Sequence, residues 1–295
     1  MKYMENKQKL SNQVFLLSII WVFIPYCTSA QPTGKDVREG LPDNYGICLI
    51  ADGKVTGVRT DAPYAMHSVM KFPQAIYVAE CLKKQKASLH ETVKVRKADL
   101  MQDTWSPMLM MFDNERHFSY AELLELSLSQ SDNNACDILF RQFGGPKSVE
   151  EYLKKLGFDD IHIKWSEREM GVNPVCSADN NCSPKGMARL FEWFYQEKDK
   201  DEDLCFVWNT MANCKTGSSR LASIIPKSSV FVHKTGTGFP SKDKRQDRND
   251  VGIIVSPDGT YKIIAVFVPQ SMIEEDVATI GEKYITSSST ARKGN

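Results

Sequence analysis

The chain has little of what metal sites and nucleic-acid surfaces need. Its 295 residues include five histidines, none in an HxH or HExxH pattern, and eight cysteines without a CxxC pair. A zinc enzyme is therefore disfavoured, because zinc sites draw their ligands from such clusters. The formal net charge is zero and no stripe of lysine or arginine stands out. A nucleic-acid partner is therefore not expected.

Long apolar runs are also scarce, and the main one lies at the N-terminus. Residues 14–27 (VFLLSIIWVFIPYC) follow a short basic stretch and are too short to span a bilayer comfortably. The small residues 28–30 (TSA) come next, as a signal peptidase requires. This pattern predicts a signal peptide over residues 1–30 with cleavage after Ala30, a periplasmic location and no membrane segment in the mature protein. A retained membrane anchor is the alternative.

Cleavage would leave seven cysteines, an odd number that requires at least one free thiol or an intermolecular bond. Cys176 and Cys182 lie in one irregular segment and are the pair placed for a local disulfide. The alternative is that most cysteines are small buried hydrophobic residues.

Strand-like runs lie near both ends of the mature chain, with helical periodicity between them. The expected strands are Gly46–Ala51, Lys54–Thr60, Val230–Gly236, Asp250–Ser256 and Tyr261–Val268. The expected helices include Tyr120–Ser127, opened by a capping box of Ser119 and Glu122, and Asn133–Phe143, stopped by Gly144-Gly145-Pro146. Two more are Pro184–Glu197, with Ser183 as its N-cap, and Glu274–Ile285. This order predicts an α/β (α+β) fold: one five-stranded antiparallel sheet drawn from both chain ends, with flanking helices, and an inserted helical domain. The expected domains are 45–61 with 215–288, and 62–214.

The segment Trp165–Cys182 interrupts the helical region without any period. It contains Gly, Pro and three Asn. A structureless loop of this length inside a compact domain is usually functional. We therefore expect residues 165–182 to form an active-site loop.

Ser68 and Lys71 form the first candidate site motif. If a helix begins near Ser68, positions i and i+3 share a face, so the Lys71 amine reaches the Ser68 hydroxyl. The helix start would also offer free backbone N–H groups and a positive dipole end. Pro73 should remove one helical hydrogen bond and bend the first turn. A serine three residues before a lysine arises easily by chance, so this motif has little weight alone.

Two further motifs stand later in the chain. Ser131-Asp132-Asn133 leads into a helix, and Asp132 or Asn133 is also suited to cap that helix. Lys234-Thr235-Gly236 follows an apolar strand, where Gly236 would let a ligand backbone approach. A second Lys-Thr-Gly at residues 215–217 has no strand before it, so Lys215 is interpreted as a surface charge.

The three motifs in this order resemble the signature of class A β-lactamases and penicillin-binding proteins. The likeness covers the chain from about Tyr45 to the last strand and is strongest to the extended-spectrum, cephalosporin-hydrolysing branch. The phrases that support it are TWSP from Thr104, SQSDNNACDILF from Ser129, VHKTGTG from Val232, and Thr216-Gly217 before Arg220. The resemblance implies the β-lactamase/DD-peptidase-like fold, a monomer, a small-molecule β-lactam substrate, and neither a metal nor another cofactor.

The resemblance also assigns roles. Ser68 would be the nucleophile, with its N–H and that of Thr237 forming the oxyanion hole. Lys71 would activate Ser68 or relay protons, and Lys234 would set a positive field and work with Ser131. Substrate-binding roles fall to the amide of Asn133, to Thr235, Gly236, Thr237 and Arg220 around the substrate carboxylate, and to Trp105 as a wall of the entrance. A plain core aromatic is the alternative for Trp105.

Glu167 separates a hydrolase from a penicillin-binding protein. A carboxylate in this loop can deprotonate a water that attacks the acyl-enzyme, and penicillin-binding proteins lack it. A solvated loop charge is the alternative, and Glu169 is interpreted as structural. The sequence therefore predicts a serine β-lactamase that confers antibiotic resistance. A D-Ala-D-Ala carboxypeptidase or a non-hydrolysing β-lactam binder are the alternatives.

The loop departs from the commonest family pattern at several positions. Gly171 stands where most members have an Asn that helps to hold the water. The usual Arg–Asp salt bridge is replaced by Trp165 and Asn180. We expect an Asp137–Asn180 hydrogen bond to brace the loop instead.

Overall fold

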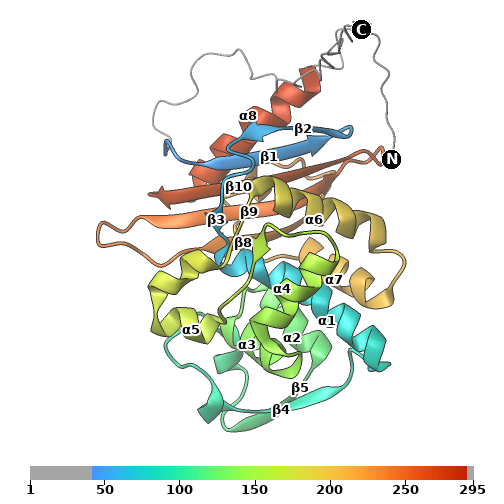
Figure 1. The fold of residues 1–295 in the computed structure, drawn as a ribbon, viewed down its shortest axis with the longest axis vertical. Coiled ribbons are helices and arrows are strands. Elements are labelled where there is room, and N and C mark those ends of the chain that lie inside the picture. Colours follow the sequence, from blue (N-terminus) through green and yellow to red (C-terminus); the bar gives the residue numbers. More distant parts are fainter. Residues whose placement is uncertain (1–41, 291–295) are drawn as a thin grey trace, which may run out of the picture. The chain divides into compact units, whose positions relative to one another are not determined.

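The computed structural model describes residues 42–290. The predicted signal peptide lies outside them. Five antiparallel strands form the main sheet in the order β2-β1-β10-β9-β8 (Figure 1). They are β1 (Gly46–Ala51), β2 (Lys54–Val58), β8 (Val230–Thr237), β9 (Gln246–Val255) and β10 (Tyr261–Ser271). The predicted sheet from both chain ends is confirmed, although β9 begins four residues before the expected Asp250 and β10 runs past Val268.

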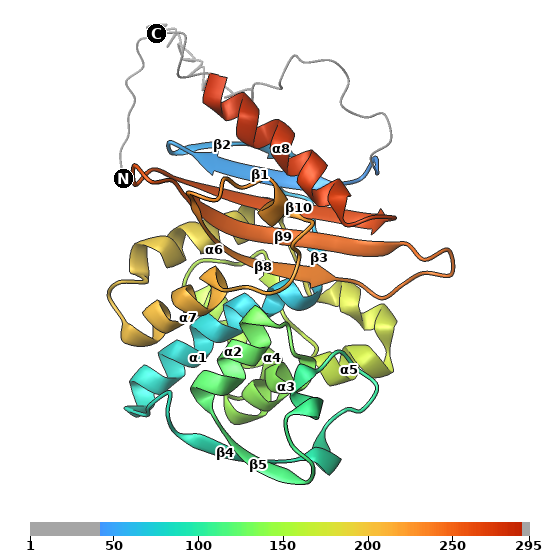
Figure 2. The ribbon, with the colours of Figure 1, turned by 180° about the vertical axis from the view of Figure 1, so that it is seen from behind.

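Both faces of the sheet are covered, so its strands are apolar on both sides. Alternation along β1 shows this: Ile47 and Leu49 pack in the cluster under α8 (Glu275–Thr290), while Cys48 and Ile50 join the larger cluster on the opposite face. Figure 2 shows α8 lying across the sheet. Side chains that alternate in this way require a strand with two buried faces.

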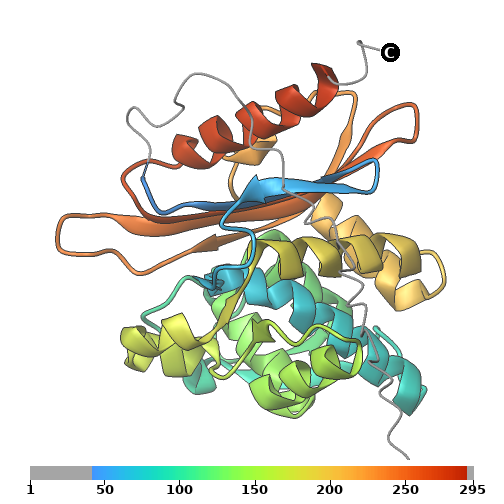
Figure 3. The ribbon, with the colours of Figure 1, turned by 45° about the horizontal axis from the view of Figure 1, so that its top comes forward.

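Helices pack against the other face and below it (Figure 3). They are α1 (Lys71–Gln85), α2 (Tyr120–Ser129), α3 (Asn133–Gln142), α4 (Gly145–Lys155), α6 (Pro184–Glu197) and α7 (Glu202–Ala212). Small sheets are made by β3 (Tyr64–Ala65), β7 (Asn181–Cys182) and β6 (Ile161–His162), and by β4 (Thr92–Arg96) with β5 (Glu115–Ser119).

Local signals explain several helix starts. The predicted capping box of Ser119 and Glu122 opens α2, and Ser183 caps α6 just before Pro184. The sequence Gly144-Gly145-Pro146, which we expected only to end a helix, also begins α4, because Pro is tolerated in the first turn.

The expectation that residues 165–182 are structureless is wrong. This segment contains α5 (Glu167–Val172), the 3₁₀ turn Pro174–Asp179 and β7. Ser166 Oγ accepts a hydrogen bond from the N–H of Glu169, and the Glu169 carboxylate accepts one from the backbone N–H of Ser166. This capping box fixes the start of a very short helix and makes Glu169 structural, as predicted.

All seven cysteines in the described part of the chain are free, so the local Cys176–Cys182 disulfide, the less favoured of the two interpretations, is not formed. Cys182 is buried in the core, whereas Cys176 is half-buried. Among residues 42–290, no helix has the length and apolar character that a membrane crossing needs.

Candidate active site

Ser68 lies in a 3₁₀ turn, His67–Met70, that leads directly into α1. Its hydroxyl accepts a 3.0 Å hydrogen bond from Lys71 Nζ, so the i, i+3 reach expected from the sequence is present. Pro73 is the third residue of α1, where backbone N–H groups lack helical partners in any case. Pro73 therefore does not cost α1 the helical hydrogen bond that we expected it to remove.

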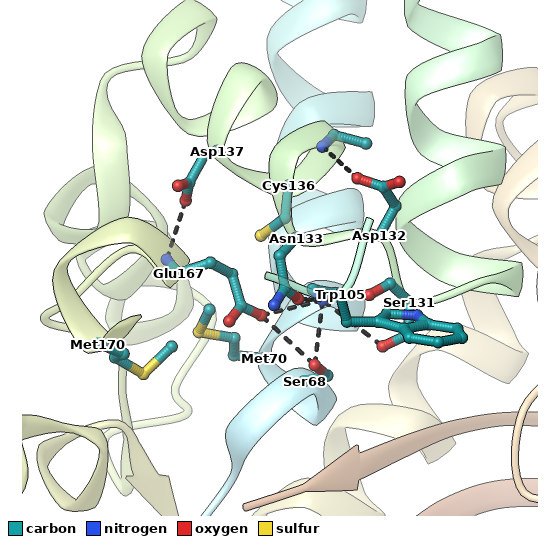
Figure 4. A network of polar contacts seen from close by, with 12 residues as sticks. Ser68, Met70, Trp105, Ser131, Asp132, Asn133, Cys136, Asp137, Glu167 and Met170 are labelled. Carbon is teal, nitrogen blue, oxygen red and sulfur yellow. Dashed lines mark hydrogen bonds and ion pairs between the residues drawn. The ribbon is translucent and has the colours of Figure 1, made fainter. Parts of the chain in front are cut away.

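A network of polar contacts includes Ser68, Asn133 and Glu167 (Figure 4). The amine of the fully buried Lys71 lies at its centre. Besides Ser68, its amine lies 2.9 Å from Glu167 Oε1, 2.8 Å from the carbonyl oxygen of Ser131 and 2.6 Å from Asn133 Oδ1. Ser68 Oγ in turn lies 3.4 Å from Glu167 Oε1. A hydroxyl, an amine and a carboxylate therefore meet at one point, and they come from two separate parts of the chain, residues 68–71 and Glu167.

Asp137 holds the end of α5 that carries Glu167. Its carboxylate accepts hydrogen bonds from the backbone N–H of Glu167 (2.9 Å) and of Arg168 (2.8 Å). Burial, together with the negative charge of Glu167, raises the pKa of Asp137 to about 7. The side chain of Glu167 is 8% exposed, so the alternative of a solvated loop charge is wrong.

The expected Asp137–Asn180 hydrogen bond is also wrong, because both side chains bond elsewhere. Asn180 Oδ1 accepts from the N–H groups of Lys164 and Trp165, and Asn180 Nδ2 donates to the Trp165 carbonyl oxygen. The Trp165 indole donates to Asp179. Asn180 therefore ties the end of the loop to its beginning, and Asp137 independently anchors the start of α5.

The Ser131 motif provides the predicted helix cap. Ser131 has a left-handed φ of 59°, and Asp132, fully buried, caps α3 by accepting from Ala135 N–H. Asp132 also accepts hydrogen bonds from the Ser106 hydroxyl and from Met108 N–H. The cap and these anchors fix the position of the motif.

Asn133 and Trp105 lie beside that motif. The amide of Asn133 donates to Thr104 and accepts from Lys71, and its backbone N–H donates to the Trp105 carbonyl oxygen. Trp105 is 64% exposed, and its indole N–H donates a hydrogen bond to the Gln130 carbonyl oxygen. The alternative of a core aromatic is therefore wrong.

Lys234 approaches from the sheet. Fully buried on β8, its amine donates to Ser131 Oγ at 2.9 Å and to the Thr235 carbonyl oxygen. Burial and the positive charge of Lys71 lower the pKa of Lys234 to about 7. Gly236 is required for a reason that differs from our expectation: a Cβ there would collide with the Met66 carbonyl oxygen and Val69 beneath the strand.

Arg220 supports this strand rather than facing solvent. Its guanidinium donates to the carbonyl oxygens of Gly236 and Asn249 and to Thr237 Oγ1, and it pairs with Glu274 at 2.9 Å. It is 2% exposed. The expected direct, bidentate hold on a substrate carboxylate is therefore not the arrangement found; Arg220 reaches the site through Thr237.

The second Lys-Thr-Gly contributes a residue that sequence reasoning missed. Lys215 is exposed, as expected. Thr216 Oγ1, however, lies 2.6 Å from Thr235 Oγ1, and Gly217, at φ 73°, makes room for the Thr235 methyl group. The repeat of Lys-Thr-Gly at residues 215–217 was the only signal in the sequence for this contact.

One polar network therefore joins six of the predicted site residues: Ser68, Lys71, Ser131, Asn133, Glu167 and Lys234. Thr235 and Thr237 lie beside it on β8, the strand that carries Lys234. The described residues contain no group of three His, Cys, Asp or Glu side chains that could hold a metal ion. A serine hydroxyl in contact with an amine and a carboxylate is suited to covalent catalysis through an acyl-enzyme.

Comparisons with known proteins agree with this chemistry. The model of the "Beta-lactamase enzyme family" matches residues 35–286. Beta-lactamase VEB-1 from Pseudomonas aeruginosa is 34% identical over 232 residues, covering 78% of this chain and 77% of that protein. The extended-spectrum beta-lactamase PER-1 from the same organism is 34% identical over 210 residues, covering 70% of this chain and 68% of that protein.

Solved structures extend the likeness to the fold. The crystal structure of TLA-3 extended-spectrum beta-lactamase superposes with a TM-score of 0.77 at 32% identity, covering 80% of this chain and 90% of that one. A beta-lactamase from Chitinophaga pinensis gives a TM-score of 0.78 at 30% identity, covering 83% and 94%. The chain therefore belongs to the class A serine β-lactamases, enzymes that hydrolyse β-lactams and confer resistance to them.

Proposed function

We propose that Ser68 is the nucleophile and that Glu167 directs the water that releases the product. The observation that carries this assignment is the position of the Lys71 amine, 3.0 Å from Ser68 Oγ and 2.9 Å from Glu167 Oε1. An amine shared between a hydroxyl and a carboxylate gives the Ser68 proton a route away from the attacking oxygen.

In acylation, Ser68 Oγ attacks the β-lactam carbonyl while its proton passes to the Lys71–Glu167 pair. We expect the backbone N–H groups of Ser68 and Thr237 to stabilise the oxyanion. As the amide bond breaks, Ser131 gives its proton to the leaving nitrogen, and Lys234, which donates to Ser131 Oγ, favours that transfer. The product of this step is an ester on Ser68.

In deacylation, Glu167 accepts a proton from a water that attacks the ester carbonyl. Support comes from the 3.4 Å separation of Glu167 Oε1 and Ser68 Oγ, the atom that would carry the ester. Asp137 holds the backbone of Glu167 in place. The proton then returns through Lys71 to Ser68.

For substrate binding we assign the carboxylate common to β-lactams to Thr235 and Thr237, with Lys234 providing positive charge. Asn133 would hold the substrate amide, and Trp105 would wall the entrance, which its 64% exposure permits. The relatives PER-1 and TLA-3 are named extended-spectrum enzymes, so we include cephalosporins with penicillins as substrates.

We further propose that the protein is exported, cleaved after Ala30, and acts in the periplasm as a monomer. Residues 45–61 with 215–288 would form one domain and 62–214 the other. The cluster between α8 and the sheet supports the first, since its members come from the two ends of the described chain.

One assay separates hydrolysis from the alternatives. The purified mature protein is mixed with an excess of a chromogenic cephalosporin. Sustained turnover supports the proposal, whereas a burst that stops at one equivalent points to a carboxypeptidase or a β-lactam binder. Cleavage of a D-Ala-D-Ala peptide by the same preparation distinguishes these two.

A further inference from the structure

His67, the residue before Ser68, is tied to the main sheet by its side chain. Its Nε2 lies 2.9 Å from Asp247 Oδ2 on β9, and the imidazole is 7% exposed. The second Asp247 oxygen accepts a hydrogen bond from the backbone N–H of Gln270 on β10. The imidazole is therefore held by a carboxylate that is itself anchored between two strands. None of these side chains has a part in the mechanism proposed above.

Asp247 is the acceptor in this contact. Burial opposes its ionisation, but the hydrogen bonds from His67 and from Gln270 N–H hold the pKa of Asp247 below its ordinary value. An ionised carboxylate has no hydrogen to donate, so His67 Nε2 carries the proton and donates the hydrogen bond. Hydrogen bonds to ionised groups are stronger than those between neutral groups, and this one joins residues 180 positions apart in the chain.

The backbone of His67 has a conformation that needs support. Its φ is 49°, in the left-handed region that residues with a Cβ rarely adopt. On its N-terminal side, Asn249 Nδ2 donates to the carbonyl oxygens of Ala65 (2.8 Å) and Met66 (3.2 Å). Asn249 and Asp247 are two residues apart on β9 and therefore lie on the same face of the sheet. One strand thus fixes both the backbone before His67 and the imidazole itself.

Gly238 leaves the space that the imidazole fills. A Cβ at this position would lie 2.8 Å from His67 Nε2, closer than two such atoms approach. Gly238 directly follows Thr237, and its N–H donates to the Asp247 carbonyl oxygen at 2.9 Å. The contact between His67 and Asp247 therefore lies against the end of β8 that carries Thr237.

Two backbone N–H groups, those of Ser68 and Thr237, are assigned above to the oxyanion. In the described part of the chain, Ser68 N–H donates to no other group. Because Gly238 N–H bonds to the Asp247 carbonyl oxygen, the adjacent Thr237–Arg248 pair is one whose backbone groups point away from each other. Thr237 N–H therefore faces away from β9. Both donors are open to a ligand.

We propose that His67 is a positioning residue: through Asp247 it fixes the peptide that carries Ser68 N–H relative to Thr237 N–H, so that both donors meet one oxygen. This inference rests on the oxyanion role proposed above for these two groups. Donors held in place stabilise the developing negative charge without having to reorganise. Loss of the contact lets the two N–H groups move apart, and the carbonyl of the acyl-enzyme is then less polarised.

The infrared carbonyl stretch of the ester on Ser68 reports this polarisation directly. Glu167→Ala, which should accumulate the ester with a cephalosporin, is compared with the double variant that also carries His67→Ala. We expect a carbonyl band at higher frequency and broader in the double variant, and Asp247→Ala in place of His67→Ala should reproduce it. An unchanged band would overturn this inference alone. The absence of any adduct in Glu167→Ala would overturn the proposed function and this inference with it.

Kinetics provide the second arm. In His67→Ala, kcat for a cephalosporin should fall about ten- to hundredfold, the scale of misplacing a group by about 1 Å. KM should stay nearly unchanged, because acylation and deacylation use the same two donors. His67→Gln, whose amide N–H can reach Asp247, should recover most of the loss. A rise in KM alone, or no recovery in His67→Gln, would contradict the positioning role.

A second contact between a histidine and a carboxylate serves as the matched control. His162 Nδ1 lies 3.3 Å from Glu150 Oε1, outside the site. His162→Ala should change neither kcat nor the carbonyl band. Urea unfolding of each variant completes the test, since partial unfolding lowers the amount of active enzyme without moving the band of the ester that forms. A band shift of equal size in His162→Ala would show that the effect is not specific to His67.

Discussion

Asp137 Oδ1 accepts a 2.9 Å hydrogen bond from the backbone N–H of Glu167. This contact joins α3 to the first residue of α5 and so fixes the backbone position from which the Glu167 side chain extends. The same carboxylate also accepts from Arg168 N–H. One buried side chain therefore fixes the helix end that carries the proposed base.

Replacing Asp137 should weaken both stability and deacylation. Asp137→Ala leaves two N–H groups without their acceptor, and we expect the free energy of unfolding to fall by about 1–3 kcal/mol. Asp137→Asn retains one carbonyl acceptor and should lose less. Urea titration and cephalosporin turnover measure the two effects. Unchanged stability and turnover in Asp137→Ala would show that the loop is held by other contacts.

Substrate binding should depend on the charge of Lys234. Its pKa of about 7 lies below the ordinary 10.5, so the ammonium is present below about pH 7 and is lost as the pH rises through that value. We expect KM for a carboxylate-bearing cephalosporin to rise over this range. Lys234→Arg keeps its charge at every such pH, because arginine is not deprotonated in proteins. Its KM should stay flat; a parallel rise in both proteins would assign the titration to another group.

Gly171 has room for the Asn side chain that the family resemblance led us to expect at this position. A Cβ would meet only Met101 Sδ at 3.7 Å, an ordinary contact, and the residue is exposed. We expect Gly171→Asn to speed decay of the acyl-enzyme by about three- to tenfold, the value of one added hydrogen bond to the water. Gly171→Ala is the matched control and should decay as the wild type does. Equal decay rates in all three proteins would remove the water-holding role from this position.

Arg220 should be required for the geometry of β8. Arg220→Ala strips the buried carbonyl oxygens of Gly236 and Asn249 of a donor, so we expect a loss of about 1–3 kcal/mol in stability and a higher KM. Arg220→Lys should recover little, since one ammonium does not reproduce the guanidinium fork. Arg245→Ala, at an exposed ion pair, is the control and should change neither quantity. Full recovery in Arg220→Lys would argue for a purely electrostatic role.

The helices and strands that were predicted correctly have local signals in the sequence. A strand-like apolar run predicted β1, and capping residues predicted the starts of α2 and α6, because these signals depend on neighbours in sequence. The start of α5 had the same kind of signal, in Ser166 and Glu169, but the absence of a longer helical period hid it.

The contacts that were mispredicted join distant parts of the chain. Arg220 was expected to face a ligand, but its partner Glu274 lies 54 residues away, and no spacing rule links the two. We expected Asn180 to pair with Asp137 by analogy with the family. In the structure, the backbone N–H groups of Lys164 and Trp165 bond to Asn180 instead. Side-chain partners of this kind depend on how the whole chain packs.

The role of Glu167 is tested most directly by Glu167→Ala with a cephalosporin, followed by intact-protein mass spectrometry. We expect one equivalent of hydrolysis at most and a persistent covalent adduct, absent in Ser68→Ala. Glu169→Ala, which removes the capping carboxylate next to it, should continue to turn over. Continued turnover by Glu167→Ala, or the absence of any trapped adduct, would contradict the assignment of Glu167 as the residue that directs the water.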